Sequence, residues 1–127
     1  MKRQLANYFF IVLHEKVESV NGNEIKFTSG DDLDFILTEN NLDLTEKQSA
    51  AGANDYYSQN CQATTLSVSE EIRKKYRNSK VVVQFKTTQG DVITLGSKEV
   101  PVRCKVNSRL NTDHWSFTRS NPTPVIT

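Results

Sequence analysis

The chain has 127 residues, with 16 basic and 15 acidic side chains and a net charge of +1 at pH 7. This length is enough for one hydrophobic core and excludes two ordinary domains. The near-neutral charge provides no long-range field that would steer the chain onto nucleic acid or an anionic membrane, so only a local basic patch could bind either one.

The N-terminal region has no pattern for membrane insertion or secretion. The longest apolar run, residues 8–13, is far shorter than the ~20 residues that a helix needs to cross a bilayer. Lys2 and Arg3 precede this run, but polar residues follow directly at 14–16. A signal peptide would instead have a longer apolar segment and a small-residue cleavage site. We therefore expect a protein that is made and kept in the cytoplasm.

The first part of the chain predicts three strands. Residues 8–20 are rich in aromatic and β-branched side chains, which favour strands over helices. Asn21 and Gly22 follow, and this dipeptide tolerates the positive φ of a tight hairpin turn. Apolar and polar residues then alternate over 24–28, which predicts the returning strand of a hairpin. Alternation over 33–38 predicts another strand, with a short helix as the competing interpretation.

The central segment, residues 40–60, has no sustained apolar period. Its small and polar residues are typical of exposed loops, and we predict a flexible loop near residues 46–58. Tyr56 and Tyr57 close this loop. These two aromatic side chains could either hold the loop to the body or contact a partner.

One segment has the pattern of a helix, which we expect near residues 69–77. Ser67 and Glu70 have the spacing of a capping box, in which each side chain satisfies a free amide at the helix start. Ile72 and Tyr76 lie four residues apart on one apolar stripe. Four basic side chains lie towards the helix end, where the helix dipole favours cations: Arg73, Lys74, Lys75 and Arg77. This cluster is also a candidate basic patch for phosphate or nucleic acid.

The region 80–107 has the clearest strand pattern. Apolar side chains recur at every second position over residues 81–85 and again over 100–106, as on one face of a β-strand. We predict a hairpin of strands 81–87 and 92–95. A separate strand is expected before the helix, over residues 61–66.

The C-terminal part predicts two strands and a tail. The strand over residues 100–106 contains Pro101, which points to an edge or to an initial strand position. A last strand is expected over 114–119, where apolar and polar residues alternate. The tail, residues 121–127, contains two prolines, and we expect it to form an extended C-terminal arm.

These elements together predict a mainly β fold. We expect an antiparallel β-sandwich or small barrel of about seven or eight short strands with one short helix. An α+β open sheet is the alternative. Because no low-complexity linker divides the chain, residues 1–120 are expected to form a single β-rich domain that ends in the C-terminal arm.

No group of residues has the spacing of a catalytic or metal site. His14 and His114 are isolated from other ligands in the sequence, and Cys61 and Cys104 are too few for a zinc site. The scattered glycines exclude a phosphate loop, and no nucleophile motif is present. We expect no metal, no cofactor and no enzyme activity. An enzyme would need a pocket where His114, Trp115 and an acidic residue meet.

Two further groups have structural interpretations. Cys104 lies on the apolar face of a predicted strand, where a buried free thiol acts as a small hydrophobe, and a disulfide with Cys61 is the alternative. Asp31, Asp32 and Asp34 form a compact acidic group. They lack the ordered ligands and closing Glu of a calcium loop, so we expect them in a solvated turn.

The last third of the chain contains the segments VVVQFKTTQGDVITLGSKEVPVRCKV and WSFTRSNPTPVI. These segments resemble small β-rich structural proteins of tailed phages and prophages, in particular tail, neck or connector components that pack in rings and end in an extended arm. The resemblance implies a non-enzymatic virion subunit that forms rings or tubes and is assembled in the host cytoplasm. The implied partners are other copies of the chain and neighbouring structural proteins.

We therefore predict a structural subunit of a larger assembly. The candidate subunit contacts lie in the central loop and the C-terminal arm: Tyr56, Tyr57, Pro122, Pro124, Val125 and Ile126. Extended arms of this kind can add a strand to the sheet edge of a neighbour. The alternative is a small nucleic-acid- or protein-binding adaptor that uses the basic helix, residues 70–77, although net neutrality disfavours nucleic acid.

Overall fold

The computed structural model describes residues 2–28, 33–39, 42–51, 54–66, 70–108 and 111–121. Strands dominate, with one short helix in these segments, which confirms the predicted mainly β class. The elements in chain order are β1 (Lys2–Leu13), the 3-10 turn η1 (His14–Lys16), β2 (Val17–Asn21), β3 (Glu24–Phe27), β4 (Asp34–Leu37), β5 (Asp43–Ala51), β6 (Asn54–Leu66), α1 (Glu70–Tyr76), β7 (Ser79–Thr87), β8 (Val92–Leu95), β9 (Val102–Ser108) and β10 (Thr112–Asn121).

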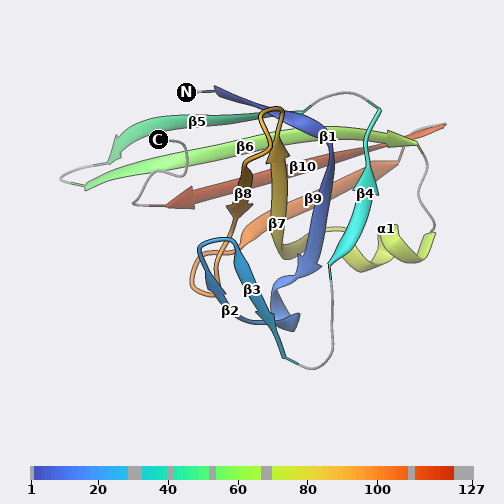
Figure 1. The fold of residues 1–127 in the computed structure, drawn as a ribbon, viewed down its shortest axis with the longest axis horizontal. Helices are drawn as coiled ribbons and strands as arrows, with labels where there is room; N and C mark the ends of the chain where they lie inside the picture. Colours follow the sequence, from blue (N-terminus) through green and yellow to red (C-terminus); the bar gives the residue numbers. More distant parts are fainter. Residues whose placement is uncertain are drawn as a thin grey trace.

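The main strands form two layers that cross at a steep angle (Figure 1). One layer contains β4, β1, β7 and β8, and the other contains β5, β6, β10 and β9, each in that spatial order. β1 joins the layers on one side because it pairs with both β5 and β7, and β7 joins them on the other side by pairing with β9. The result is a closed barrel of six strands, with β4 and β8 as two extra strands. This closure excludes the open-sheet alternative.

The core lies between the two layers and follows the alternation along each strand. Trp115 and Phe117 on β10 are 1% and 0% exposed. The ring centroid of Phe9 on β1 lies 5.1 Å from that of Phe117 and 5.4 Å from that of Trp115, both in edge-on geometry. The Trp115 Nε1 atom donates a 3.1 Å hydrogen bond to the Thr65 hydroxyl, which satisfies its polar group inside the core.

The β2–β3 hairpin packs on the outer face of the first layer. Asn21 pairs with Glu24, so the turn consists of Gly22 and Asn23, one residue later than predicted. Gly22 has a φ of +60°, which glycine adopts without strain. The buried side chains that join this hairpin to β1 and β7 are Val12, Val17 and Val82.

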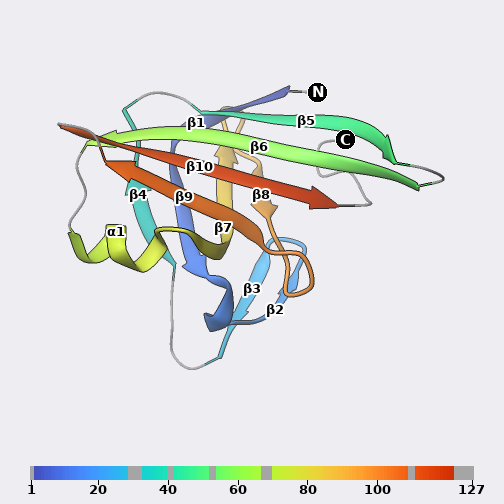
Figure 2. The ribbon, with the colours of Figure 1, turned by 180° about the vertical axis from the view of Figure 1, so that it is seen from behind.

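Helix α1 lies at one end of the barrel, next to β7 and β9 (Figure 2). Its predicted apolar stripe is confirmed, because Tyr76 is buried and Ile72 packs against the core. The Tyr76 hydroxyl lies 3.3 Å from the Ile11 carbonyl oxygen and forms a hydrogen bond with the Asp34 carboxylate. Ser67, the first residue of the predicted capping box, lies outside the described residues.

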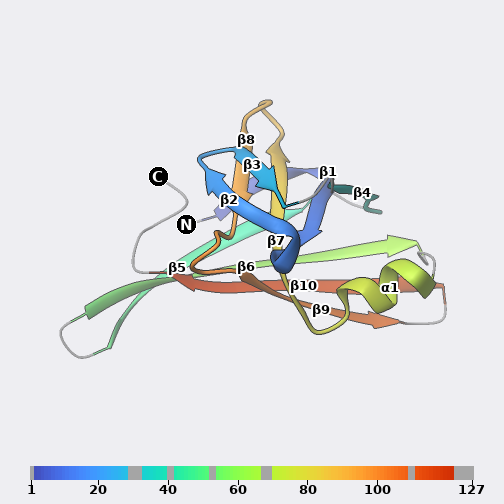
Figure 3. The same cartoon turned by 90° about the horizontal axis from the view of Figure 1, so that it is seen from below.

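The predicted flexible loop near residues 46–58 is wrong. The chain forms the long β5–β6 hairpin here, paired from Leu44 with Cys61 to Ala51 with Asn54. Figure 3 shows that this hairpin extends beyond the body of the molecule. Polar residues form strands here because partners on neighbouring strands complete their hydrogen bonds, a context that strand propensity does not include.

The predicted strand over residues 8–20 is divided in two. β1 ends at Leu13 and β2 begins at Val17, with the turn η1 between them. The break coincides with the polar run that ends the apolar pattern, and His14 Nε2 donates a 2.7 Å hydrogen bond to the Lys98 carbonyl oxygen.

Most other strand predictions are confirmed, with shifted ends. The region 33–38 forms β4 and not the competing helix, and the β7–β8 hairpin has its turn where it was expected. β9 begins at Val102, directly after Pro101, which agrees with an initial position for the proline. β10 is longer than predicted at both ends.

Candidate assembly interface

Two strands of the first layer have an open edge in the described part of the chain. β4 pairs only with β1, and β8 pairs only with β7. The Thr38 amide donates a 2.8 Å hydrogen bond to the Asn7 carbonyl oxygen, so alternate residues of this segment bond to β1. The backbone groups of Phe35 and Leu37 therefore point the other way. A further strand could pair with β4 through these two residues.

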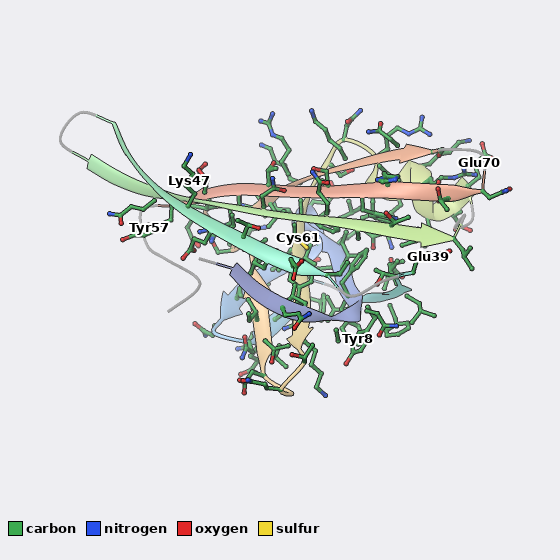
Figure 4. The ribbon with its side chains drawn as sticks, turned by 90° about the horizontal axis from the view of Figure 1, so that it is seen from above. Tyr8, Glu39, Lys47, Tyr57, Cys61 and Glu70 are labelled. Atoms are coloured by element: carbon green, nitrogen blue, oxygen red, sulfur yellow. The ribbon has the colours of Figure 1, made fainter. Side chains whose placement is uncertain are left out.

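The side chains next to this edge form an exposed apolar surface, here named the β4 patch: Tyr8, Phe10, Phe35 and Leu37. Phe35 and Leu37 are 55% and 61% exposed. The Phe35 ring centroid lies 5.3 Å from those of both Tyr8 and Phe10. Tyr8 lies on the outer side of β1, away from β6 and β10 (Figure 4). A cluster of large apolar side chains that faces solvent marks an interaction surface.

The residues of the β4 patch are not among the predicted contacts. The sequence feature that could have indicated this surface is the segment from Leu33 to Leu37. It has apolar side chains on both faces although its strand is short. Among the side chains that the structure describes, two other large apolar ones are exposed, Val92 on β8 at 40% and Leu66 on β6 at 68%. Val92 lies at the opposite end of the layer, whereas Leu66 follows Thr64, whose carbonyl oxygen accepts a hydrogen bond from the Glu39 amide just beyond β4.

Two residues of the predicted basic patch hold α1 to neighbouring strands. The Arg73 Nη1 atom donates to the Ser108 hydroxyl at 3.1 Å and lies 3.7 Å from the carboxylate of Asp113, whose side chain is fully buried. The Lys75 Nζ atom lies 2.9 Å from the Asp34 carboxylate. These contacts reduce the positive charge that the helix offers to a ligand.

The other two residues of the basic patch face solvent. Lys74 forms an exposed pair with Glu70 at 3.3 Å, one helical turn away, which contributes little free energy. Arg77 is exposed in the turn after the helix. The four cations therefore do not form one free surface.

The predicted subunit contacts are only partly described. Tyr57 lies half-buried on β6, near Lys47 of β5, where the hairpin leaves the body (Figure 4). Tyr56 is on the same strand, but its side chain lies outside the described part. The remaining predicted contacts also lie outside it: Pro122, Pro124, Val125 and Ile126.

A polar row crosses three strands in the second layer. Glu46 and Gln59 are cross-strand partners on β5 and β6, and Gln59 is the partner of Arg119 on β10. Gln59 Nε2 donates a 2.7 Å hydrogen bond to Glu46 Oε2, and Arg119 Nε donates a 2.9 Å bond to the Val100 carbonyl oxygen. Burial lowers the pKa of Arg119, and the nearby Glu46 carboxylate opposes that shift.

We interpret this polar row as a structural element. The opposite charges of Glu46 and Arg119 compensate each other, and the bond to Val100 ties β10 to the β8–β9 connection. A surface cleft of about 460 Å³ lies beside the row and is lined in part by Gln59, Arg103 and Arg119.

His114 and Trp115 do not line this cleft. His114 is half-buried between the buried Asp113 and Trp115, and alternation along β10 places it on the opposite face from both. His14 is bound to the β8–β9 connection. In the acidic group, Asp34 binds α1, whereas Asp31 and Asp32 lie outside the described residues.

Cys61 and Cys104 are both buried and free, so the disulfide alternative is wrong. Each is a cross-strand partner of Phe117, one from β6 and one from β9. Two strand spacings separate them, roughly 10 Å. A disulfide requires Cα atoms within about 7 Å.

We expect both native thiols to be unreactive towards a thiol reagent at pH 8. Burial raises the pKa of each thiol to about 12, and the Asp43 carboxylate adds to the effect at Cys61. Almost no thiolate, the reactive form, is present at that pH. Labelling in urea should follow unfolding, and an exposed Leu66→Cys control should react at once. Rapid labelling of the native wild-type chain would contradict this description of the core.

The described segments show no group of three His, Cys, Asp or Glu side chains placed to hold a metal ion. Within the same segments, no helix has the length and apolarity needed to cross a membrane. A scan against models of protein families finds no match, and comparisons with curated proteins and with solved structures find none either.

Proposed function

We propose that this protein is a non-enzymatic structural subunit of a larger assembly and that the β4 patch is one of its subunit contacts. The proposal rests on two features that occur together on β4. β4 has an unpaired edge in the described residues, and its outward side chains Phe35 and Leu37 are more than half exposed. Monomeric proteins usually protect such an edge with charge, proline or a covering segment.

Within this proposal, the specific role is that of a tailed-phage or prophage virion component, such as a tail, neck or connector subunit. The resemblance of the last third of the chain suggests this role, and the strand-rich body is compatible with it. Subunits of rings or tubes need surfaces that bind other copies, and the β4 patch would supply one of them. If the chain has this role, the protein would be located in the virion.

The adaptor alternative has less support. Arg73 and Lys75 would have to bind a phosphate or an acidic partner, but they already contact carboxylates of β10 and β4. Binding by the remaining exposed cations would weaken steeply with salt, so a salt titration with an oligonucleotide distinguishes the two functions.

The double variant Phe35→Lys and Leu37→Lys is expected to shift assembly to concentrations about 10–100-fold higher, because two desolvated apolar contacts are replaced by charges. The measurement is molar mass in solution as a function of protein concentration. Val92→Lys is the control, since it places a charge on an exposed residue of β8, which lies at the opposite end of the first layer. The proposal fails if the wild-type chain stays monomeric at high concentration, or if the double variant assembles as the wild type does.

A further inference from the structure

We infer that residues 122–127 of a second copy of this chain add as a strand to the open edge of β4, so that subunits join head to tail. This inference rests on the proposed function and names the partner of the same site. It connects two features that are far apart in one chain, an unpaired edge with an apolar face and a short tail that contains apolar residues.

The spacing of prolines in the tail fits a strand that pairs on one edge only. Pro122 and Pro124 have no amide hydrogen, and in an extended segment their nitrogens point to the same edge. The amides of Thr123, Val125 and Thr127 point to the opposite edge. The proline edge keeps the Ile126 amide as its single donor, whereas the opposite edge has three amides, so the segment bonds better to one neighbouring strand than to a second, as suits a strand added at the end of a sheet.

The same alternation defines the register on β4. Phe35 and Leu37 direct their backbone groups to the open edge, so they must face residues of the tail that have free amides. An antiparallel register with Val125 opposite Leu37 and Thr127 opposite Phe35 satisfies this condition and places Ile126 opposite Ile36. The pairing stops before Thr123, because the Glu39 amide that would face it already bonds to the Thr64 carbonyl oxygen. Val125 then lies on the β4 patch.

This register also matches apolar side chains on the inner face. Ile36 is 5% exposed and belongs to the main core cluster. Ile126 of the added strand would lie beside it and extend that cluster. Both faces of the added strand would therefore remove apolar surface from water.

A long distance separates the start of the tail from β4 of the same chain. The Glu39 amide bonds to the Thr64 carbonyl oxygen, and Thr64 is the cross-strand partner of His114, so β4 ends near the first part of β10. The tail begins after Asn121, about 23 Å further along β10 at the strand rise of roughly 3.3 Å per residue. Val125, four residues later, reaches at most about 14 Å.

Figure 1 shows the same separation, with β4 and the end of β10 in opposite halves of the long axis. The β4 strand crosses β10 at a steep angle, so moving along β4 does not shorten the gap substantially. The tail must therefore reach another molecule. A contact between two different surfaces of the same chain is heterologous and generates a ring when the rotation closes.

Cysteine cross-linking tests the register in the full chain. One preparation carries Leu37→Cys and the other Val125→Cys, and the two are mixed and oxidised under assembling conditions. Directly opposite residues of a hydrogen-bonded antiparallel pair have Cα atoms about 5.5 Å apart, within disulfide range. We expect a covalent dimer that requires both variants, while the buried native thiols Cys61 and Cys104 take no part.

A second variant measures the contribution of the tail. Val125→Ser with Ile126→Ser keeps the chain length and both prolines but removes the apolar contacts, and we expect assembly to require at least about tenfold more protein. Circular dichroism and unfolding should be unchanged, because the altered residues lie beyond β10. The matched control is Thr123→Ser, which should assemble as the wild type does.

Three results would overturn the inference while leaving the proposed function in place. In the first, the wild type assembles but the mixed variants form no Leu37–Val125 bond. In the second, Leu37→Cys alone forms the dimer, which indicates two β4 edges paired with each other. In the third, a chain that carries both cysteines closes the bond within one dilute molecule. A wild-type chain that never assembles would overturn the inference and the proposed function together.

Discussion

Phe117→Ala is expected to lower the free energy of unfolding by about 3–5 kcal/mol. Phe117 has no exposed surface, and its ring centroid lies 5.1 Å from that of Phe9, 6.0 Å from that of Phe85 and 6.3 Å from that of Trp115. Because the barrel closes around these rings, the neighbouring side chains cannot shift inwards to fill the space that the phenyl ring leaves. Urea unfolding followed by tryptophan fluorescence measures the change.

Leu66→Ala is the control for that measurement. It removes a large apolar side chain that is 68% exposed, so the free energy of unfolding should change by no more than about 0.5 kcal/mol. A loss of less than about 1 kcal/mol for Phe117→Ala would mean that the two layers pack loosely at the centre, contrary to the burial seen there.

Gly96→Ala is expected to lower the free energy of unfolding by about 1–3 kcal/mol from backbone strain alone. Gly96 follows β8 and has a φ of +104°, which a residue with a Cβ atom rarely adopts. The added methyl group would also lie 3.2 Å from the Val81 carbonyl oxygen and 3.2 Å from Val102 Cγ2. Both neighbours belong to the core strands, so the structure can relax only by moving them.

Gly90→Ala separates the two contributions. Gly90 lies in the β7–β8 turn with a φ of +98°, but no atom lies within 4 Å of the position of an added Cβ. Gly90→Ala therefore introduces the backbone strain of a positive φ without a steric contact of the added methyl group. The difference between the two variants in urea unfolding measures the steric part, and equal losses would show that the close approach at Gly96 has no energetic consequence.

The strands of the second half could be predicted because local sequence and tertiary context agree there. Val81, Val83 and Phe85 recur at every second position, and each is buried in the core. The same holds for Trp115 and Phe117 on β10. A face of a strand that packs against a second layer must be apolar, so the pattern survives in the sequence.

The β5–β6 hairpin could not be predicted in this way. Its buried face includes Glu46 and Gln59, which are polar and break the apolar period. They are buried because they bond to each other and lie beside Arg119, which comes from a strand distant in the sequence. Burial of polar groups depends on such partners, and a single segment does not contain the partner.

The candidate interface could not be predicted from the sequence for the same reason. Phe35 and Leu37 read as ordinary strand residues, and only the pairing of β4 with β1 alone leaves them at an open edge. Conversely, Arg73 and Lys75 read as a free basic patch, and only the position of α1 brings them to Asp113 and Asp34. Exposure is a property of the assembled fold.

The sequence by itself determined a strand-rich fold with one short helix, the β2–β3 and β7–β8 hairpins, and most of the core, because alternation and turn residues act over a few neighbouring positions. Only the tertiary structure decided that the barrel closes, that the central segment is a hairpin and that β4 has an open apolar edge. These features depend on which strands meet, and strand pairing is set by contacts between residues that are far apart in the chain.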